Sequence, residues 1–400
     1  MTGGPIVILG AGMSGGNAAA TLRDEGYAGR LVLLGDEDAL PFGRPPLSKT
    51  YLRGEEDLSG WLVRPADWYE TNRVDLIRAR ATRVVTAERR VELDSGADVA
   101  YSQLLIATGG RNRRPRMVGA ELAGVFQLRT TADCDAIKRA ANKGARALIV
   151  GMGFIGSEVA ASLRQLGLDV TAVLPGAAPL ASVLGPEMGS VMAGIHADAG
   201  VRLMAHETVE RFEGAGRVER AVTRGGLRID CDLAVVAVGI EPEVDVLHDT
   251  GIALDDGVLV DGACRTNVPD VFAAGDVANH LHPVFGRVRV EHYNNAEKMG
   301  AAAARSMLGS TAAYGYIHTF WSDQYEHKLE YAGHARQWDE FVVRGSLEDR
   351  KLVGFYLQGG VVRAAVGLNR GGDPELEPGS EMADASALIA RQSPLTGGMG

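Results

Sequence analysis

Short apolar runs, several followed at once by glycine, recur along the first three quarters of the chain. The runs at 5–9 and 147–150 have the length of buried strands, and each precedes a predicted helix. Comparable strands are predicted at 31–34, 103–107, 232–238 and 269–274. Helices are predicted from about Ser14 to Gly26 and from Asn294 to Leu308. Strands that alternate with helices predict an α/β fold with parallel sheets.

The pattern changes at about His318. Strands are predicted from there at 328–332, 340–344, 351–358 and 361–368, which indicates a small α+β domain at the C-terminus. Residues 35–53 are rich in proline and are predicted to be irregular, and such a loop inside a compact domain is usually functional. The last residues, Thr396–Gly400, are expected to be disordered.

The motif Gly-x-Gly-x-x-Gly occurs twice, at Gly10–Gly15 and at Gly151–Gly156, each time between a predicted strand and a predicted helix. The first glycine makes a tight turn, the second lets backbone approach a pyrophosphate, and the third lets the helix pack on the strand. The helix N-terminus then faces the phosphates with free N–H groups. Two copies predict two bound dinucleotides and a redox relay between a flavin and a nicotinamide.

Composition narrows the class of protein. The chain has 400 residues and a net charge of −10, which argues against nonspecific binding of nucleic acid. No apolar run approaches the length of a membrane span, and strand 1 begins too early to leave room for a signal peptide. The three cysteines, Cys134, Cys231 and Cys264, form no disulfide framework and no Cys-x-x-Cys metal or redox motif. This usage predicts a reducing cytoplasm.

Several polar residues stand where a dinucleotide would need them. Asp36 and Glu37 follow the second strand, about 20 residues beyond the first glycine motif, where an acid accepts from ribose hydroxyls. Asp276 follows another buried strand and could accept from the sugar-alcohol chain of a flavin, although a strand-end Gly-Asp is usually only a turn. The paired prolines between Arg44 and Lys49 fix the backbone that carries these two cations, but composition alone favours a solvated basic loop.

The chain resembles the FAD-dependent ferredoxin reductases of oxygenase systems, which include putidaredoxin reductase, rubredoxin reductase and the reductase components of aromatic dioxygenases. A more distant resemblance is to the flavoprotein core of apoptosis-inducing factor. Two strings are the most specific, Arg-Pro-Pro-Leu-Ser-Lys at 44–49 and Phe-Trp-Ser-Asp-Gln at 320–324. The matching segments follow the family's order over nearly the whole chain: 40–42, 44–49, 104–110, 128–130, 151–158, 272–276, 291–293 and 320–324.

The resemblance implies a glutathione-reductase-like α/β fold with two Rossmann-like domains and a small α+β C-terminal domain. The FAD domain would comprise residues 1–110 and 240–317, with the NAD(P) domain, residues 111–239, inserted in it. Residues 318–400 would form the C-terminal domain at the flavin and partner interface. The implied activity is hydride transfer from NAD(P)H to FAD, followed by transfer of single electrons to a [2Fe–2S] ferredoxin or a rubredoxin. That partner would feed an oxygenase of the P450 or Rieske type.

The resemblance also implies site residues. Lys49 and Glu158 would pair at the flavin–nicotinamide junction, and Trp321 would shield the flavin where the iron–sulfur partner binds. Tyr293 stands where many relatives have tryptophan, and its ring would keep the apolar packing against the flavin. The implied cofactor contacts are Gly10, Gly12, Ser14, Gly15, Asp36, Glu37, Arg44, Lys49, Val84, Ala107, Thr108, Gly109, Arg129, Gly151, Gly153, Phe154, Ile155, Gly156, Glu158, Gly239, Asp276, Glu291, His292, Tyr293 and Trp321, with no metal site.

The second nucleotide site departs from the family pattern. Leu174 stands at the end of the second strand of the NAD(P) domain, where the family usually has an acid that accepts from ribose hydroxyls. No arginine stands there to bind a 2′-phosphate. We therefore predict weak discrimination between NADH and NADPH. Glu243, after the turn at Gly239, also replaces a residue that is usually asparagine.

The sequence also bears on other functions that share this two-nucleotide architecture. A disulfide reductase or a peroxide-type enzyme needs cysteine early in the chain, and none precedes Cys134. A membrane NADH:quinone reductase needs an amphipathic C-terminus, which residues 374–400 do not provide. A redox- or nucleotide-sensing flavoprotein and an NAD(P)H oxidase stay open, because the altered nucleotide site suits either. A partner ferredoxin would be acidic, so two basic regions are candidate docks, although either could be a plain solvated face: Arg287, Arg289, His327 and Lys328, or Arg111, Arg113, Arg114 and Arg116.

Overall fold

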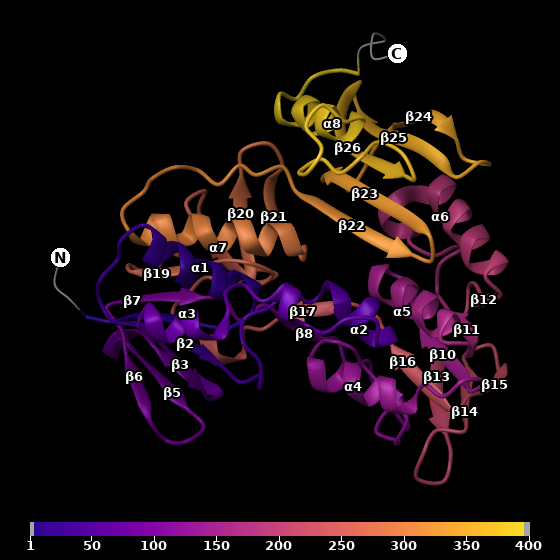
Figure 1. Cartoon of the computed structure of the whole chain (residues 1–400), viewed down its shortest axis with the longest axis horizontal. Helices are drawn as coiled ribbons and strands as arrows, with labels where there is room; N and C mark the ends of the chain where they lie inside the picture. The colour runs from indigo at the N-terminus through magenta and orange to yellow at the C-terminus, as the bar shows by residue number, and fades with distance from the viewer. Residues whose placement is uncertain (1–3, 396–400) are drawn as a thin grey trace. The chain divides into compact units, whose positions relative to one another are not determined.

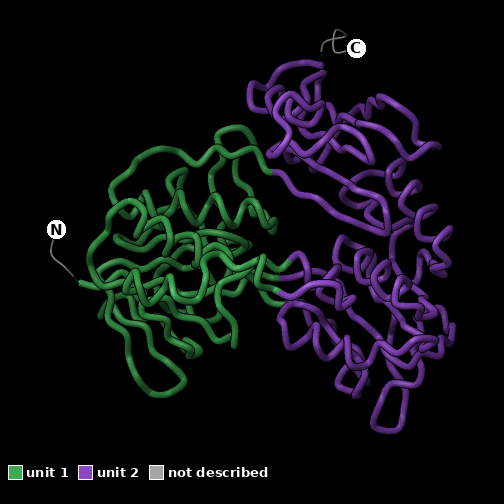
Figure 2. The backbone as a smooth tube through the Cα atoms, viewed as in Figure 1, with its two compact units in different colours: residues 1–44, 58–111, 241–318 green, residues 45–57, 112–240, 319–400 purple. Residues whose placement is uncertain are grey.

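The computed structural model describes residues 4–395, and its contacts divide the chain into two compact units (Figure 2). Unit 1 consists of residues 1–44, 58–111 and 241–318. Unit 2 consists of residues 45–57, 112–240 and 319–400. Each unit is therefore assembled from three separate stretches of chain.

Unit 1 is built on a five-stranded parallel sheet in the order β19-β7-β1-β2-β3 (Figure 1). The strands are β1 (Ile6–Leu9), β2 (Leu31–Gly35), β3 (Val74–Arg78), β7 (Gln103–Ile106) and β19 (Val271–Ala273). The central strands are buried on both faces, which explains their nearly continuous apolar sequence. Helix α1 (Met13–Asp24) packs against helix α7 (Tyr293–Met307), although the two come from distant parts of the sequence.

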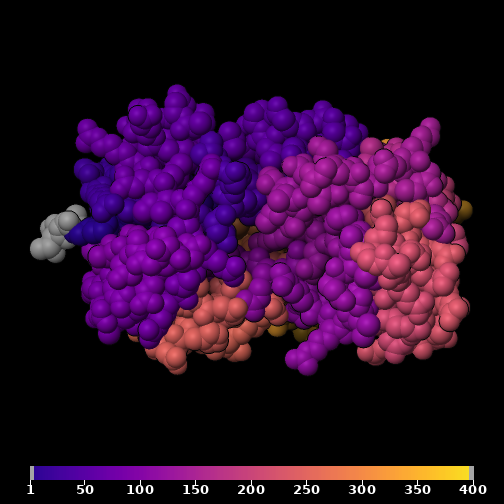
Figure 3. Space-filling model, turned by 90° about the horizontal axis from the view of Figure 1, so that it is seen from below, coloured from indigo at the N-terminus to yellow at the C-terminus, as the bar shows by residue number. Residues whose placement is uncertain are grey.

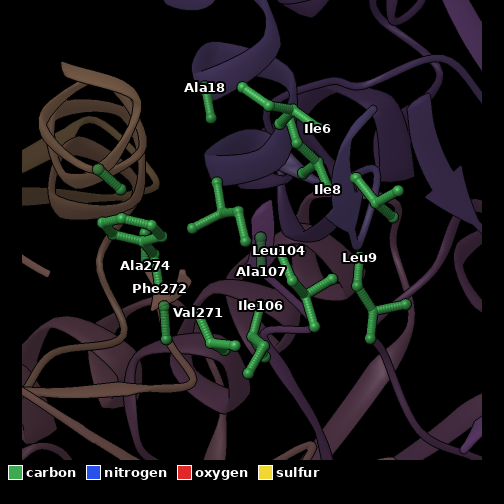
Figure 4. Packing of buried hydrophobic residues seen from close by; sticks show 14 of the residues in the cluster. Ile6, Ile8, Leu9, Ala18, Leu104, Ile106, Ala107, Val271, Phe272 and Ala274 are labelled. Atoms are coloured by element: carbon green, nitrogen blue, oxygen red, sulfur yellow. The ribbon is translucent and has the colours of Figure 1, made fainter. Parts of the chain in front are cut away.

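Figure 4 shows how this core closes, with side chains of β1, β7 and β19 lying close to one another and to α1. Ile8, Leu104 and Ile106 are fully buried, and Phe272 of β19 is nearly so. Because β19 pairs with β7, residues from the third stretch of the unit form one edge of the sheet.

Smaller elements complete unit 1. One antiparallel sheet has the order β4-β5-β6, and a mixed sheet has the order β18-β20-β21. In Figure 3, salmon-coloured residues of the 241–318 stretch lie directly beside purple residues of the 58–111 stretch on the surface of this unit. The elements are η2 (Ser59–Trp61), α3 (Ala66–Thr71), β4 (Ala81–Val85), η3 (Thr86–Glu88), β5 (Arg90–Leu93), β6 (Asp98–Ala100), η4 (Asp245–Leu247), β18 (Val258–Val260), β20 (Ala278–His282) and β21 (Gly286–Arg289).

Unit 2 repeats the parallel architecture with a sheet in the order β12-β11-β10-β16-β9. The strands of this sheet and the antiparallel sheet β13-β14-β15 that follows it are β9 (Val125–Phe126), β10 (Arg146–Val150), β11 (Asp169–Val173), β12 (Arg202–Met204), β13 (Val209–Glu213), β14 (Arg220–Thr223), β15 (Arg228–Asp230) and β16 (Leu233–Val236). The helices are η1 (Pro45–Ser48), α2 (Thr50–Arg53), α4 (Thr131–Ala140), α5 (Phe154–Gln165) and α6 (Ala181–Asp198).

The C-terminal stretch of unit 2 is an antiparallel sheet in the order β22-β23-β26-β25-β24. Its elements are β22 (Thr319–Gln324), β23 (His327–Gly333), β24 (Glu340–Ser346), β25 (Lys351–Gln358), β26 (Val361–Leu368) and α8 (Glu381–Ala390). Helix α6 shares a hydrophobic core with this sheet, and β22 lies against α5. The two structural parts of unit 2 are thereby packed together.

The structure corrects the predicted elements in places. Residues 35–53 were predicted to be irregular, but η1 and α2 occupy their second half. Helices α4, α6 and α8 were not predicted. The predicted helix from Asn294 to Leu308 is confirmed as α7, one residue earlier. Strands β8 (Gly110–Asn112) and β17 (Ile240–Pro242) form a two-stranded sheet where the chain passes between the units. The expected disorder of Thr396–Gly400 lies outside the described residues.

Candidate functional site

The first glycine loop connects β1 to α1, and its three glycines meet different surroundings. A Cβ atom at Gly10 would lie 2.1 Å from the carbonyl oxygen of Ala107, and one at Gly15 would lie 1.9 Å from that of Gly10. A Cβ at Gly12 would meet nothing within 4 Å, and the residue has an ordinary φ of −84°. The packing of the protein thus requires the outer glycines but not Gly12, so the space beside Gly12 suits the close approach of a ligand.

A pocket of about 350 Å³ opens beside this loop in unit 1. Asp36, directly after β2, lines it together with Gly10 and Thr108. The Ser14 hydroxyl, on the first turn of α1, is buried and has no hydrogen-bond partner among residues 4–395. A pyrophosphate and a ribose would supply the partners for these groups, so the residues present fit a dinucleotide.

Two acids beyond Asp36 have arginine partners. Arg44 Nη2 donates to Glu37 Oε2 at 2.6 Å, and its guanidinium lies 5.3 Å from the ring centre of Phe42. The unexplained Glu243 also has a role, because its Oε1 accepts from Arg111 Nη1 at 2.9 Å. The main chain of Glu243 bonds to Thr108 and Gly109, so this acid helps to shape the wall of the pocket that it lines.

Tyr293 begins α7 and packs against a residue that sequence reasoning missed. Its ring meets Trp61 edge-on, with 6.0 Å between ring centres, and burial raises its pKa to about 12. A Cβ at Gly43 would lie 2.6 Å from the Tyr293 ring, so this glycine is required by the aromatic contact. Trp61 had no local signal beyond being an aromatic residue after a long loop.

The remaining expected residues of unit 1 fall into two groups. The Val84 side chain is buried in the hydrophobic core, which leaves only its main chain for a ligand. Glu291 pairs with Arg289 at 2.6 Å, just before α7. The others lie at strand ends or at the start of α7: Ala107, Thr108, Gly109, Asp276 and His292.

The second glycine loop connects β10 to α5 in unit 2 and repeats the first. A Cβ at Gly151 would lie 2.4 Å from the carbonyl oxygen of Ala237, and one at Gly156 would lie 2.0 Å from that of Gly151. A Cβ at Gly153 would again meet nothing within 4 Å. Ile155 is 46% exposed beside the loop. This second site therefore also fits a dinucleotide by the same test.

Lys49 and Glu158 form the ion pair that was hypothesised from the sequence. Lys49 Nζ donates to Glu158 Oε2 at 2.8 Å and to the Pro45 carbonyl at 3.2 Å. Both side chains are nearly buried, with 11% and 4% exposed. Burying a pair of this kind costs desolvation free energy, and removing one partner strongly destabilises the folded protein because the other charge stays buried. The pairing is confirmed, whereas its role at the flavin stays a prediction.

Two hydroxyl groups that were not predicted complete the surroundings of Glu158. Ser48 Oγ donates to Oε2 at 2.5 Å, and Ser322 Oγ donates to Oε1 at 2.8 Å. Both serines are buried. They come from segments more than 100 residues away along the chain, so no local sequence pattern could have identified them.

Trp321 lies on β22 between two acids. It is paired across the sheet with Glu330, whose pKa burial raises to about 7 although Lys328 opposes this. Burial also raises the pKa of Asp323, despite a hydrogen bond from Trp321. Phe154 makes an edge contact with Phe320 of the same strand, 4.7 Å between ring centres, so its ring serves packing within unit 2.

Leu174 directly follows β11 and is only 3% exposed. Its main chain accepts from the N–H of Glu207 and donates to the carbonyl of Met204, both at 3.1 Å. The position at which the family usually has an acid is therefore occupied by a buried, apolar side chain. The two other expected residues of unit 2 lie in loops, Arg129 before α4 and Gly239 after β16, with a φ of +94° at Gly239.

Most of the basic candidates for a partner dock are engaged within the protein. Arg289 pairs with Asp256 and Glu291, and Lys328 pairs with Glu330 at 2.8 Å. Arg111 is held by three acids. Arg114 and Arg116 are exposed. Among residues 4–395, no helix could cross a membrane, and no cluster of three or more histidine, cysteine or acidic side chains could hold a metal ion.

Comparison with known proteins decides the family. Residues 4–300 match the family described as pyridine nucleotide-disulphide oxidoreductase, and residues 319–396 match the family described as reductase C-terminal. The chain belongs to the pyridine nucleotide-disulphide oxidoreductases. The resemblance stated from the sequence and the predicted fold class are confirmed, and the protein is an oxidoreductase.

Relatives of this oxidoreductase cover nearly its whole length. It is 34% identical to rhodocoxin reductase of Rhodococcus erythropolis over 98% of this chain and 90% of the relative. It is 37% identical to the ferredoxin–NAD(+) reductase component of the biphenyl dioxygenase system of Paraburkholderia xenovorans (strain LB400) over 91% and 90%. The crystal structure of a covalent putidaredoxin reductase–putidaredoxin complex is similar, with a TM-score of 0.93, 29% identity, and coverage of 98% and 94%.

Proposed function

We propose that the protein is an FAD-dependent reductase that takes a hydride from NADH or NADPH and passes single electrons to a [2Fe–2S] ferredoxin or a rubredoxin. The partner would in turn feed an oxygenase of the P450 or Rieske type. The observation that carries the proposal is the pair of glycine loops, in which Gly12 and Gly153 leave space that the protein itself does not fill. Bound FAD supplies the chemistry that converts a two-electron donor into single-electron transfers.

The sites are divided between the residues as follows. The loop at Gly12, the carboxylate of Asp36 and the hydroxyl of Ser14 would hold FAD, with the other FAD contacts that the resemblance implies, Lys49 and Arg129 among them. The loop at Gly153 would hold the nicotinamide nucleotide. Lys49, held by Glu158, would place a fixed positive charge at the reacting ring, and Trp321 would lie on the path of electrons to the partner.

The domain assignment is part of this proposal. Residues 1–110 and 240–317 would bind FAD, residues 111–239 would bind NAD(P)H, and residues 318–400 would form the C-terminal domain. The core of unit 1 and the parallel sheet of unit 2 support two separate nucleotide-binding folds.

Disulfide chemistry is not part of the proposed function, although the family name includes it. Cys134, Cys231 and Cys264 are buried, and burial raises the pKa of each thiol to about 12. A reactive cysteine needs a lowered pKa and access to solvent. Free, buried thiols also suit the reducing cytoplasm in which we propose that the protein works.

The test is anaerobic stopped-flow reduction of the bound flavin by NADH and, separately, by NADPH. We expect fast bleaching with either nucleotide and comparable rates, because Leu174 provides no acid to favour NADH. Reduction of cytochrome c should then be fast only when a ferredoxin is added. Slow bleaching with both nucleotides would overturn the reductase proposal in favour of a sensor, and fast consumption of oxygen without a ferredoxin would favour an oxidase.

A further inference from the structure

The ion pair of Lys49 and Glu158 is the end of a longer chain of buried polar side chains within unit 2. Ser322 Oγ contacts Glu158 Oε1, and Gln324 Nε2 lies 3.2 Å from Ser322 Oγ. His196 Nε2 lies 2.9 Å from Gln324 Oε1, and Tyr325 Oη lies 3.2 Å from His196 Nδ1. The side chains come from three elements, α5, β22 and α6, and from the residue after β22.

These groups are among the most completely buried polar residues of the protein. Ser322 and Gln324 are each 1% exposed, and His196 is 0% exposed. Ser322 and Gln324 are two positions apart on a strand, so they point to the same face. Buried polar groups destabilise the fold unless they are hydrogen-bonded. Here each side chain bonds to the next one in the hydrogen-bonded series.

The charge at one end determines the direction of every hydrogen bond. The carboxylate of Glu158 can only accept, so the Ser322 hydroxyl must donate its single proton to it. Ser322 Oγ must then accept from the Gln324 amide nitrogen, which turns the Gln324 carbonyl toward His196. His196 must therefore carry its proton on Nε2, and its bare Nδ1 accepts from the Tyr325 hydroxyl.

We propose, as an extension of the function proposed above, that Ser322, Gln324 and His196 are positioning residues that fix the carboxylate of Glu158 and, through it, the ammonium of Lys49. All donors in the chain point toward the carboxylate, so the aligned dipoles stabilise its negative charge and strengthen one another. Neutral His196 is required by this arrangement, and burial lowers the pKa of His196 to about 4.

This series of hydrogen bonds positions the charges of Glu158 and Lys49 and does not conduct a proton. A proton passes readily through hydroxyl and imidazole groups, but the Gln324 amide would have to adopt a high-energy tautomer to pass one on. Ser322 therefore affects the reaction only through where Glu158 and Lys49 are held. The strand that carries Ser322 inward carries Trp321 on its other face, so β22 supplies both a positioning residue and the proposed electron path.

The experiment uses the flavin-loaded protein and anaerobic stopped-flow reduction by NADH. We expect Ser322→Ala to lower the limiting reduction rate about tenfold, since misaligned groups lose rate steeply. The dissociation constant for NADH should change by less than twofold. Ser322→Thr keeps the hydroxyl and should recover most of the rate. The matched control is Ser306→Ala, a buried serine of α7 whose hydroxyl has no partner among residues 4–395 and whose loss should leave the rate unchanged.

A double-mutant cycle distinguishes a shared positioning role of His196 and Ser322 from independent structural damage by each substitution. His196→Leu alone should slow reduction severalfold, but it should add nothing to Ser322→Ala, because His196 acts only through Ser322. His196→Gln keeps an N–H donor and should be close to wild type. The proposal would be overturned if the fold-reductions of the two single variants multiply in the double variant. It would also be overturned if the reduction rate of Ser322→Ala lies within twofold of wild type.

A second measurement does not depend on activity. In ¹⁵N-edited NMR of the protein with and without flavin, His196 should be the neutral Nε2–H form from pH 8 to pH 5. Ser322→Ala should shift its Nε2–H resonance, and Ser306→Ala should not. An Nδ1–H form would overturn the proposal even if wild-type reduction is fast. Slow reduction by wild type, with the expected NMR spectrum, would reject the reductase function but leave the hydrogen-bond chain intact.

Discussion

The two glycine loops are built alike, yet their helices differ two residues past the third glycine. In α1 this position is Asn17, whose amide donates to the Met13 carbonyl one turn earlier. In α5 it is Glu158, whose carboxylate is held by Lys49, Ser48 and Ser322. The same backbone thus serves two purposes. In the proposed function, the first loop holds a nucleotide, and the second also places charge beside one.

A second difference lies at the ends of the neighbouring strands. Asp36 follows β2 and lines the pocket of unit 1, whereas Leu174 follows β11 and is buried. In the proposed function, the glycine loop defines where a pyrophosphate lies, and the residue at the next strand end decides which ribose is recognised.

The largest expected effect comes from filling the space beside each middle glycine. Gly12→Val should yield protein without bound flavin, and Gly153→Val should yield yellow protein whose reduction by NADH is more than 100-fold slower. Neither change should alter the free energy of unfolding of the flavin-free protein by more than about 0.5 kcal/mol, since a Cβ at either position lies more than 4 Å from any atom beyond the neighbouring residues. Flavin absorbance, stopped-flow reduction and urea unfolding measure the three quantities.

Gly15→Ala is the matched control for these variants. Its Cβ would meet the Gly10 carbonyl at 1.9 Å, so it should destabilise unit 1 by about 3 kcal/mol with or without cofactor. Equal destabilisation by Gly12→Val would show that the space beside Gly12 is not reserved for a ligand.

Breaking the Lys49–Glu158 ion pair should show that the residue two positions past the third glycine matters for the reaction in α5 but not in α1. Lys49→Met leaves the Glu158 carboxylate buried without its cation, so we expect a loss of about 3 kcal/mol in unfolding free energy. The double variant Lys49→Met/Glu158→Gln should regain most of that stability, but flavin reduction should stay about 100-fold slow. Asn17→Ala in α1 should change reduction by less than twofold. Unchanged hydride transfer in Lys49→Met would refute the catalytic role.

Acid should weaken both units through buried histidines whose pKa is lowered, His196 in unit 2 and His282 in unit 1. Burial lowers the pKa of His196 in unit 2 and of His282 in unit 1 from 6.5 to about 4. The unfolded chain therefore binds more protons between these values, so stability is full above about pH 6.5 and falls toward pH 4. Between pH 7 and pH 5 the loss should be about 2 kcal/mol per histidine. Urea unfolding at pH 7 and pH 5 measures it.

Glutamine variants test the assignment to each unit. His282 Nε2 lies 3.0 Å from the Tyr316 carbonyl, and the N–H of Val284 donates to Nδ1, so a neutral ring is required there too. His196→Gln and His282→Gln should each flatten part of the pH dependence. A pH dependence that is unchanged in both variants would assign the acid sensitivity to other groups.

The smallest expected effect concerns the choice of nicotinamide nucleotide. Leu174→Glu restores an acid after β11 and should raise the preference for NADH over NADPH about tenfold, which corresponds to about 1.4 kcal/mol. The ratio of kcat/KM for the two nucleotides measures it. Asp36→Leu in unit 1 should weaken flavin retention without changing this ratio. A strong NADH preference in wild type would show that another residue has taken the place of the acid.

The sequence predicted those parts of the fold that have local signatures. Both glycine loops and the parallel strands were readable because their patterns are continuous. Helix α6 was missed because Gly185 and Pro186 interrupt it, with a φ of +83° at Gly185. Helix α4 was not predicted, although the Thr130 and Asp133 that form a capping box at its start are a local sequence signal for a helix.

The site was predictable only where the resemblance or a motif pointed to it. Lys49 and Glu158 were expected to pair, and the structure confirms that they do. Ser48, Ser322 and His196 were missed because their contacts join segments far apart in the sequence, which only the folded chain brings together. Glu243 was noticed as unusual, but its partner Arg111 could be seen only in the structure.

The edge strand β19 has a consequence for how the protein is made. Its residues, 271–273, pair with β7 and complete the sheet that β1 begins at residue 6. At roughly 5–20 residues per second, a ribosome takes on the order of ten to thirty seconds to extend the chain from β7 to β19. Throughout that time the nascent N-terminal region exposes an unpaired strand edge, which is a template for mispairing. Slow synthesis or truncation before residue 271 should therefore increase the need for chaperones.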